Sequence, residues 1–374
     1  MAITRELKAA RKFGPGYFIK EQMELREWIQ EDMAEVLGIT SKHLNKILQD
    51  KQPLTLDMAK ILAVAFNTSA QYWINLDTDY RLWLKKEKSV SEIEADTKAM
   101  IYERMPIADM VKKGWLPKPK SVNELKEFVT GFWKKKELNF EFMEAQLPCL
   151  TRKSDAYNLY NASYALTWFQ MAQLQANTFH TGPYDESGLK ALMDILYSYT
   201  RNPNGINLFI RALQKVGVTF LVLPHLQKTY LDGAAFIADG KPVIVYTGRY
   251  KRIDNFWFTV AHELAHVLLH LNAEHPFILD NLRDGTIDEL EEEANQLASE
   301  KLRHPEIISF LDPYLNYLTT SKIEVCAEKL NIHPAIIIGK LAFDKKISYS
   351  NQSLYNENVL DSIDAEFKPI AFFQ

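Results

Sequence analysis

The chain has 374 residues, of which 47% are hydrophobic and 25% are charged. This is the composition of a globular protein with a sizeable core, and the length exceeds that of one ordinary domain. No apolar run reaches the roughly 18 residues that span a bilayer, and the N-terminus, MAITRELKAARKFG, lacks the apolar centre of a secretory signal, so a membrane protein is excluded and the cytoplasm is expected. Cys149 and Cys326 form no CxxC pair, which excludes a disulfide framework and a cysteine zinc site. The net charge of −4 gives no global sign of nucleic-acid binding, so a DNA-binding surface would have to be local.

Residues 1–85 are predicted to form a bundle of short helices. Apolar residues recur at helical spacing in three blocks, 28–37, 44–48 and 58–66. A glycine at position 38 ends the first block, and a threonine or serine can cap the second, which gives a helix-turn-helix outline. Helices this short are not stable alone, so we expect them to pack on one another.

The second helix of this outline would bury Leu44, Ile47 and Leu48 and turn its polar residues outward. Such side chains suit phosphates and the base edges of a major groove, and Gln30 at the start of the first helix is placed to donate to a phosphate. Charge gives weak support, because basic and acidic residues nearly balance over residues 1–80, and an ordinary helical hairpin is the alternative. The predicted DNA-contacting residues are Gln30, Thr40, Ser41, Lys42, His43, Asn45 and Lys46.

The sequence of this region resembles a known class of regulator. The segments WIQEDMAEVLG, LNKIL and LTLDMAKILAVAFNTSAQYWINL are similar to the HigA-type antitoxins of the Xre helix-turn-helix class. The resemblance implies a lambda-repressor-like domain that forms a homodimer, binds double-stranded operator DNA and pairs with a RelE-like or HigB-like toxin.

The remaining chain divides into three predicted segments, 86–200, 201–310 and 311–374. The first is a helical connector, and the last has a helix-turn-helix outline that is more typical of packing than of base reading. In the middle segment, the β-branched stretches and the turn ADGKP predict a hairpin over 234–246, followed by helices over 255–271 and 288–302. The predicted fold class is mainly α with a small β-sheet, that is, α+β.

A metal-binding pattern, H-E-x-x-H, lies within FTVAHELAHVLLH. His262 and His266 are one helical turn apart on one face, so they can offer two ring nitrogens to one ion. The alternative is a pair of unrelated core histidines around a helix-favouring glutamate. The apolar surroundings argue against that alternative, because an ionised Glu263 buried there needs a cationic partner.

Two imidazoles leave a site incomplete, since catalytic zinc usually takes three protein ligands. His270 lies about 12 Å along the helix from His262, too far to share its ion, whereas geometry does not exclude His275 in the following loop. The better candidates belong to DELEEEANQLASEKL, where Glu291 and Glu293 flank an apolar stripe on opposite sides, so periodicity leaves both open. That stripe consists of Leu290, Ala294, Leu297 and Ala298.

FTVAHELAHVLLH followed by EEEANQLA resembles the ImmA/IrrE family of metallopeptidases, with its HExxH motif and a downstream E-A-N-x-F-A helix. The resemblance implies a zincin-like fold, Zn²⁺ as the cofactor, His262, His266 and Glu293 as its ligands, and Glu263 as the catalytic base. The chain departs from the family at Leu297 and in KLRHP, neither of which is a ligand.

Zinc lowers the pKa of bound water toward about 7 and polarises a carbonyl, and a carboxylate such as that of Glu263 then accepts the proton of the water, which is the chemistry of peptide hydrolysis. The sequence thus predicts a cytoplasmic DNA-binding transcriptional regulator, or antitoxin-like protein, with a zinc endopeptidase domain that cleaves itself or an Xre-type repressor. One alternative is a non-enzymatic HigA-type antitoxin or repressor whose metal site is structural or sensory. Another is a metallopeptidase whose N-terminal hairpin only dimerises.

Overall fold

The computed structural model describes residues 12–85, 88–143, 159–272, 277–279, 289–348 and 357–368. The chain divides into two compact units, Met1–Asp96 and Thr97–Gln374. Helices dominate both units and one small sheet lies in the second, which confirms the predicted α+β class. In the described part of the chain, no helix has the length and apolar character that crossing a membrane requires.

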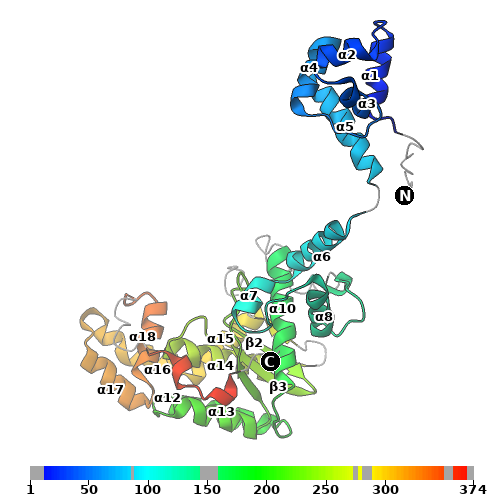
Figure 1. Ribbon diagram of the computed structural model, residues 1–374. Coiled ribbons are helices and arrows are strands. Elements are labelled where there is room, and N and C mark those ends of the chain that lie inside the picture. The colour runs from blue at the N-terminus through cyan, green and yellow to red at the C-terminus, as the bar shows by residue number, and fades with distance from the viewer. Residues whose placement is uncertain are drawn as a thin grey trace. The chain divides into compact units, whose positions relative to one another are not determined.

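Helices α1 to α5 form the core of the described part of the first unit (Figure 1). Their apolar faces meet in one core around the fully buried Trp73, as short amphipathic helices require. Side chains of Thr40, Thr55 and Ser69 each accept a backbone N–H at a helix start, so these helix beginnings were readable from the sequence. The helices are α1 (Pro15–Glu24), α2 (Gln30–Leu37), α3 (Ser41–Leu48), α4 (Leu56–Phe66) and α5 (Ala70–Leu84).

The predicted helix-turn-helix outline is confirmed in α2 and α3. Gly38 ends α2 in the left-handed conformation, with φ 65° and ψ 31°, which a glycine adopts without steric cost. Two residues later, Thr40 Oγ1 accepts the backbone N–H of His43 at 3.2 Å and begins α3. The turn therefore has the short Gly-containing form expected of this motif.

The second unit contains a four-stranded sheet in the order β1-β3-β2-β4. Strand β3 is parallel to β1 and antiparallel to β2, and β2 is also antiparallel to β4. The predicted hairpin is confirmed, with Asp239 at φ 47° and Gly240 at φ 74° in its two-residue turn. The strands are β1 (Thr219–Val222), β2 (Gly233–Ala238), β3 (Lys241–Tyr246) and β4 (Phe277–Leu279).

Both faces of this sheet are buried, because apolar side chains alternate between two separate cores. Ala234, Phe236 and Val243 face a core shared with α10, which lies beside β2 in Figure 1. The rings of Phe169 on α10 and Phe236 on β2 are 5.1 Å apart. Part of the region predicted to be only a connector therefore covers one face of the sheet, namely α6 (Val90–Arg104), which contains the division between the units, α7 (Ile107–Lys112), α8 (Val122–Phe132) and α10 (Leu159–Ala176). The helices α11 (Glu186–Asp194) and α12 (Leu196–Thr200) of the same region belong to the core on the other face.

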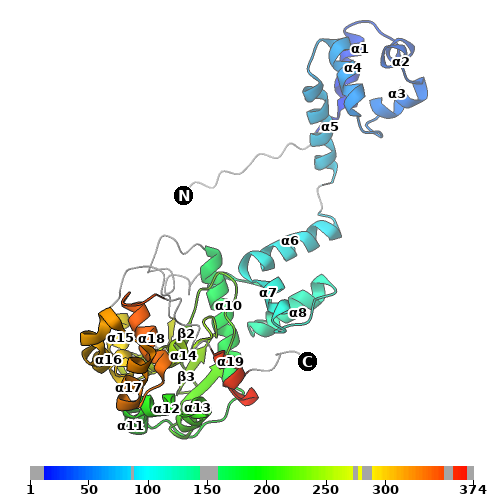
Figure 2. The same cartoon turned by 90° about the vertical axis from the view of Figure 1, so that its left-hand side faces the viewer.

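The other face packs against α14, which runs through the middle of the second core. Helix α18 also packs on α14, where Gly339 leaves room for the side chain of Asp254. The described residues of segment 311–374 contribute to this core, and most of α18 is buried there rather than free to read bases. Figure 2 shows α17 and α18 packed together beside α16. The elements on this side are α13 (Gly205–Lys215), α14 (Ile253–Leu269), α15 (Glu289–Lys301), α16 (His304–Leu311), η1 (Asp312–Tyr317), α17 (Thr320–Leu330), α18 (Pro334–Phe343), α19 (Val359–Ser362) and η3 (Ala365–Phe367).

Candidate functional site

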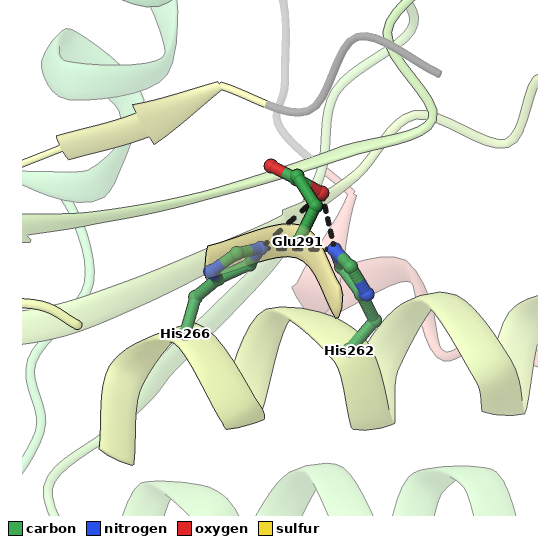
Figure 3. A group of neighbouring side chains, drawn as sticks. All are labelled: His262, His266 and Glu291. Atoms are coloured by element: carbon green, nitrogen blue, oxygen red, sulfur yellow. Dashed lines mark hydrogen bonds and ion pairs between the residues drawn. The ribbon is translucent and has the colours of Figure 1, made fainter. Parts of the chain in front are cut away.

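Helix α14 holds the H-E-x-x-H motif in the interior of the second unit. His262 is 2% exposed and His266 is fully buried. Figure 3 shows both imidazoles rising from the same face of the helix toward Glu291, as the four-residue spacing predicts. The helix is apolar nearly all round, so these polar rings have only specific neighbours, and not bulk water, to satisfy them.

Three potential ligand atoms converge at this place. Nε2 of His262 lies 2.9 Å from Nε2 of His266, and Glu291 Oε2 lies 3.3 Å from the first nitrogen and 3.7 Å from the second. Three donors arranged tetrahedrally about a zinc ion would be about 3.3–3.6 Å apart. Two ring nitrogens and a carboxylate oxygen, all within 4.8 Å of one another, therefore fit a divalent ion in both size and donor type.

The carboxylate that lies beside the two histidines is that of Glu291, whereas the sequence resemblance implied Glu293 as the third ligand. Glu291 has a 15% exposed side chain beside the two histidines, while the side chain of Glu293 is 62% exposed and contacts a different histidine. The geometry therefore favours Glu291, one of the two positions that periodicity left open, and the ligand set stays a prediction. His275 lies outside the described residues.

The difference arises from the close packing of α15 on α14. Ala294 and Ala298 are fully buried and let the two helices approach, whereas Leu290, which seemed part of the inward stripe, is 38% exposed. With about 100° per residue, Glu291 lies about 40° from the middle of a face centred on the two alanines, and Glu293 lies about 120° away. A prediction from hydrophobicity alone places the leucines at the helix contact, because it ignores that two helices approach most closely where their residues are small.

Glu263 follows His262 in the chain and is 1% exposed. Its carboxylate lies against the start of β2, where a Cβ atom on Gly233 would come within 2.2 Å of Glu263 Oε1. Only a residue without a side chain leaves room for the carboxylate in this position. No local pattern in the sequence points to Gly233, because the contact joins a strand and a helix that are distant along the chain.

Electrostatics favour the charge states that a metal site needs. Burial lowers the pKa of His266 below its usual value of 6.5, which keeps the imidazole neutral near pH 7. Burial opposes ionisation of Glu291, but its hydrogen bonds and charge interactions with His262 and His266 outweigh that effect and hold the pKa of the carboxyl below its usual 4.5. Neutral imidazoles and an ionised carboxylate are the forms that bind a divalent cation.

Two further histidines lie around this group. His270 is 6% exposed, and its Nδ1 lies 2.8 Å from Nδ1 of His266, the nitrogen that points away from Glu291. His304, at the start of α16, stacks on Phe258 with their rings 5.9 Å apart, and the ring of Phe258 in turn stacks on that of His262 at 6.2 Å. Neither His270 nor His304 belongs to the group of converging ligand atoms.

In the first unit, the structure places most of the predicted DNA-contacting residues on the surface. Gln30 is the first residue of α2, and Thr40 has a second role as the cap of α3. His43 differs from the prediction, because it is half-buried and its Nε2 is enclosed by the domain. The exposed ones are Gln30, Thr40, Ser41, Lys42, Asn45 and Lys46.

Comparisons with known proteins match one family in each unit. A family described as helix-turn-helix matches residues 19–73, from α1 into α5, and a peptidase family described as the IrrE N-terminal-like domain matches residues 205–327, from α13 into α17. The second match contains the whole cluster of His262, His266 and Glu291. The resemblances to the Xre and ImmA/IrrE classes are thereby supported.

A curated relative extends the first match. A protein of Haemophilus influenzae described as an uncharacterized HTH-type transcriptional regulator is 31% identical over 72 residues, which cover 19% of this chain and 67% of that protein. The chain therefore belongs to the helix-turn-helix transcriptional regulators, and its second unit carries an IrrE N-terminal-like domain.

Proposed function

We propose that this chain is a cytoplasmic DNA-binding regulator whose second unit is a zinc-dependent endopeptidase that cleaves the chain itself or a partner repressor of the Xre class. The observation that carries the proposal is the convergence of His262, His266 and Glu291 beside the buried Glu263. A structural site needs only ligands, whereas a buried carboxylate on the ligand helix itself, for which Gly233 leaves room, suits a catalytic base.

Zinc held by His262, His266 and Glu291 would act as a Lewis acid toward a peptide carbonyl and make a water molecule acidic. The chain supplies the proton transfers. Glu263 would accept the proton of the attacking water at its carboxylate and then deliver it to the leaving amine. The buried faces of α14 and α15 would fix the ligands and keep bulk water away from them.

The first unit would bind double-stranded operator DNA through α3. Lys42 and Lys46 would contact phosphates, and Asn45 would lie toward base edges. Asn45 Oδ1 already accepts a hydrogen bond from Gln49 Nε2 at 2.6 Å, which limits its rotamers and would orient it in a groove. The matched helix-turn-helix family and the exposure of these side chains support this role.

The proposed partners follow from the HigA-type resemblance. We propose a homodimer that also binds a RelE-like or HigB-like toxin. Exposed apolar residues on α4 offer a surface for a second copy, since Leu56 is 59% exposed, Ile61 38% and Val64 85%. Sedimentation of the purified chain, alone and with a co-expressed toxin, would test both partners.

The decisive experiment compares the wild type with Glu263→Gln, a variant that keeps the shape of the side chain and loses its basicity. Each protein would be loaded with zinc and incubated alone, with operator DNA and with an Xre-type repressor. We expect fragments only from the wild type. Identical fragment patterns from both proteins would exclude proteolysis by this site and favour a structural or sensory metal.

A further inference from the structure

His270, four residues beyond the H-E-x-x-H motif, lies between a proposed ligand and an exposed carboxylate. Its Nδ1 lies 2.8 Å from Nδ1 of His266, and its Nε2 lies 3.0 Å from Oε2 of Glu293. Glu293 projects from α15 with a 62% exposed side chain, whereas the side chain of His270 is 4% exposed. A continuous line of polar contacts thus runs from the buried site to an exposed carboxylate.

The protons along this line can be assigned from chemistry alone. If His266 binds an ion through Nε2, its neutral ring carries the remaining proton on Nδ1 and donates it to Nδ1 of His270. His270 then carries its own proton on Nε2, which lies within hydrogen-bonding distance of Glu293. Each donor along the chain faces an acceptor, so a single arrangement of protons satisfies every contact.

We propose that His270 and Glu293 are positioning residues of the metal centre, which fix the tautomer and ring orientation of His266 through a Glu293–His270–His266 hydrogen-bond chain. The inference rests on the proposed metal site. It gives Glu293 a role outside the ligand set, and it accounts for a third histidine that is too distant to bind the ion.

The physical effect would be on the strength of the ligand. When His266 donates a hydrogen bond to His270, and His270 donates one to the carboxylate of Glu293, the imidazole of His266 becomes a more basic ligand. The same hydrogen bonds keep its ring from rotating. Loss of such outer partners typically lowers metal affinity 10-fold to 100-fold. We expect an effect of that size from His270 and a smaller one from Glu293, which lies one contact further from the ion and is partly hydrated.

The alternative is that these hydrogen bonds are purely structural, and that the contact between His270 and Glu293 merely joins α14 to α15. The two readings differ in what changes when the contact is lost. Structural loss would lower the stability of the metal-free protein and leave the affinity of folded protein for zinc unchanged. A positioning role would lower the affinity while the metal-free protein stays nearly as stable, since Glu293 is mostly exposed.

The experiment uses the full-length chain and measures zinc affinity by competition with a chelator, together with the thermal unfolding midpoint of the metal-free protein. The variants are Glu293→Ala, His270→Leu and His270→Gln. Glu292→Ala is the matched control, because Glu292 is an exposed glutamate on the same turn of α15. Visible absorption of the cobalt-loaded chain reports on the ligand field independently of affinity.

We expect His270→Leu to lower zinc affinity 10-fold to 100-fold and His270→Gln to recover part of it, because an amide oxygen can still accept from His266. Glu293→Ala should lower the affinity severalfold relative to Glu292→Ala and shift the cobalt spectrum. Equal affinities and spectra for Glu293→Ala and Glu292→Ala would overturn the inference while leaving the metal site intact. A wild type that binds neither zinc nor cobalt would overturn the metal site itself.

Discussion

The two candidate sites of this chain, the predicted DNA-binding helix α3 and the histidine cluster on α14, differ in how far their side chains are exposed. Helix α3 presents Lys42, Asn45 and Lys46 to solvent, whereas His262 and His266 of α14 are at most 2% exposed. Exposed polar groups are satisfied by water until a ligand arrives, so their neighbours need no fixed arrangement. Buried polar groups must find specific partners in the fold, and their neighbours are therefore constrained.

This difference teaches where single substitutions should have large effects. A DNA-binding surface spreads its free energy over many phosphate contacts, each of which contributes little. A buried metal centre depends on three ligands and one base, and the loss of one cannot be offset by the others.

Removing a ligand should have the largest effect. We expect His266→Ala to lower zinc affinity by more than the 10-fold to 100-fold that outer partners contribute, because one of three ligands is lost. Chelator competition measures the affinity. The exposed His180 provides the control variant His180→Ala, which should bind zinc like the wild type. Equal zinc affinity of His266→Ala and His180→Ala would contradict the expectation that the buried histidine binds the ion and the exposed one does not.

The contact between Gly233 on β2 and Glu263 should affect the peptidase rate but not the zinc content. Gly233→Ala would force the Glu263 carboxylate to move, and loss of general acid–base catalysis typically costs 10²-fold to 10⁴-fold in rate. Peptidase rate and zinc content would be measured on the same sample, and we expect zinc to remain. Gly131→Ala on α8 is the control, because its added methyl group meets nothing within 4 Å. Full peptidase activity of Gly233→Ala would show that catalysis does not need the space that Gly233 leaves for the Glu263 carboxylate.

The buried histidine next to Phe258 should make the stability of the second unit depend on pH. Burial lowers the pKa of His304 to about 4. Between pH 6.5 and 4 the unfolded chain binds a proton that the folded chain does not, so the free energy of unfolding decreases as the pH falls through this window. From pH 7 to pH 5 this group should cost about 2 kcal/mol.

Urea unfolding of the metal-free chain at the two pH values measures this loss. The variant His304→Gln should lose about 2 kcal/mol less than the wild type, whereas His180→Gln, at an exposed position, should behave like the wild type. The same pH dependence in all three proteins would show that His304 is not responsible.

Single substitutions on the proposed DNA-contacting surface of α3 should each have a small effect on DNA affinity, and these effects should add. Lys42→Ala and Lys46→Ala should each weaken binding to all sequences and reduce the salt slope of the affinity by about 1, as the loss of one phosphate contact requires. Titrations of operator-region DNA at two salt concentrations give the slope. Lys60→Ala on α4 is the control, since Lys60 is exposed outside α2 and α3. An unchanged slope in both α3 variants would place the DNA contacts elsewhere.

The sequence predicted the first unit more fully than the second. Helix caps such as Thr40, the left-handed Gly38 and the buried Leu44, Ile47 and Leu48 follow from local rules, and each lies where the pattern indicated. His43 was the exception, because its enclosure depends on neighbouring parts of the domain rather than on its place along α3.

In the second unit, local rules gave the hairpin, the ligand helix and the pair of histidines. They did not give Gly233 beside Glu263, nor the choice of Glu291 over Glu293. Both depend on tertiary packing, in one case a strand against a helix and in the other two helices that approach at alanines. The same packing brings described residues of 311–374 into the core, although the sequence suggested an extension.

The proposed metal centre is tested most directly by the zinc content of the full-length chain after dialysis against a chelator, for the wild type, Glu291→Gln and Glu292→Gln. We expect one zinc per chain in the wild type and in Glu292→Gln and almost none in Glu291→Gln, since of these two glutamates only Glu291 lies beside His262 and His266. Retention of one zinc by Glu291→Gln, or its absence from the wild type, would contradict a metal centre built from α14 and α15.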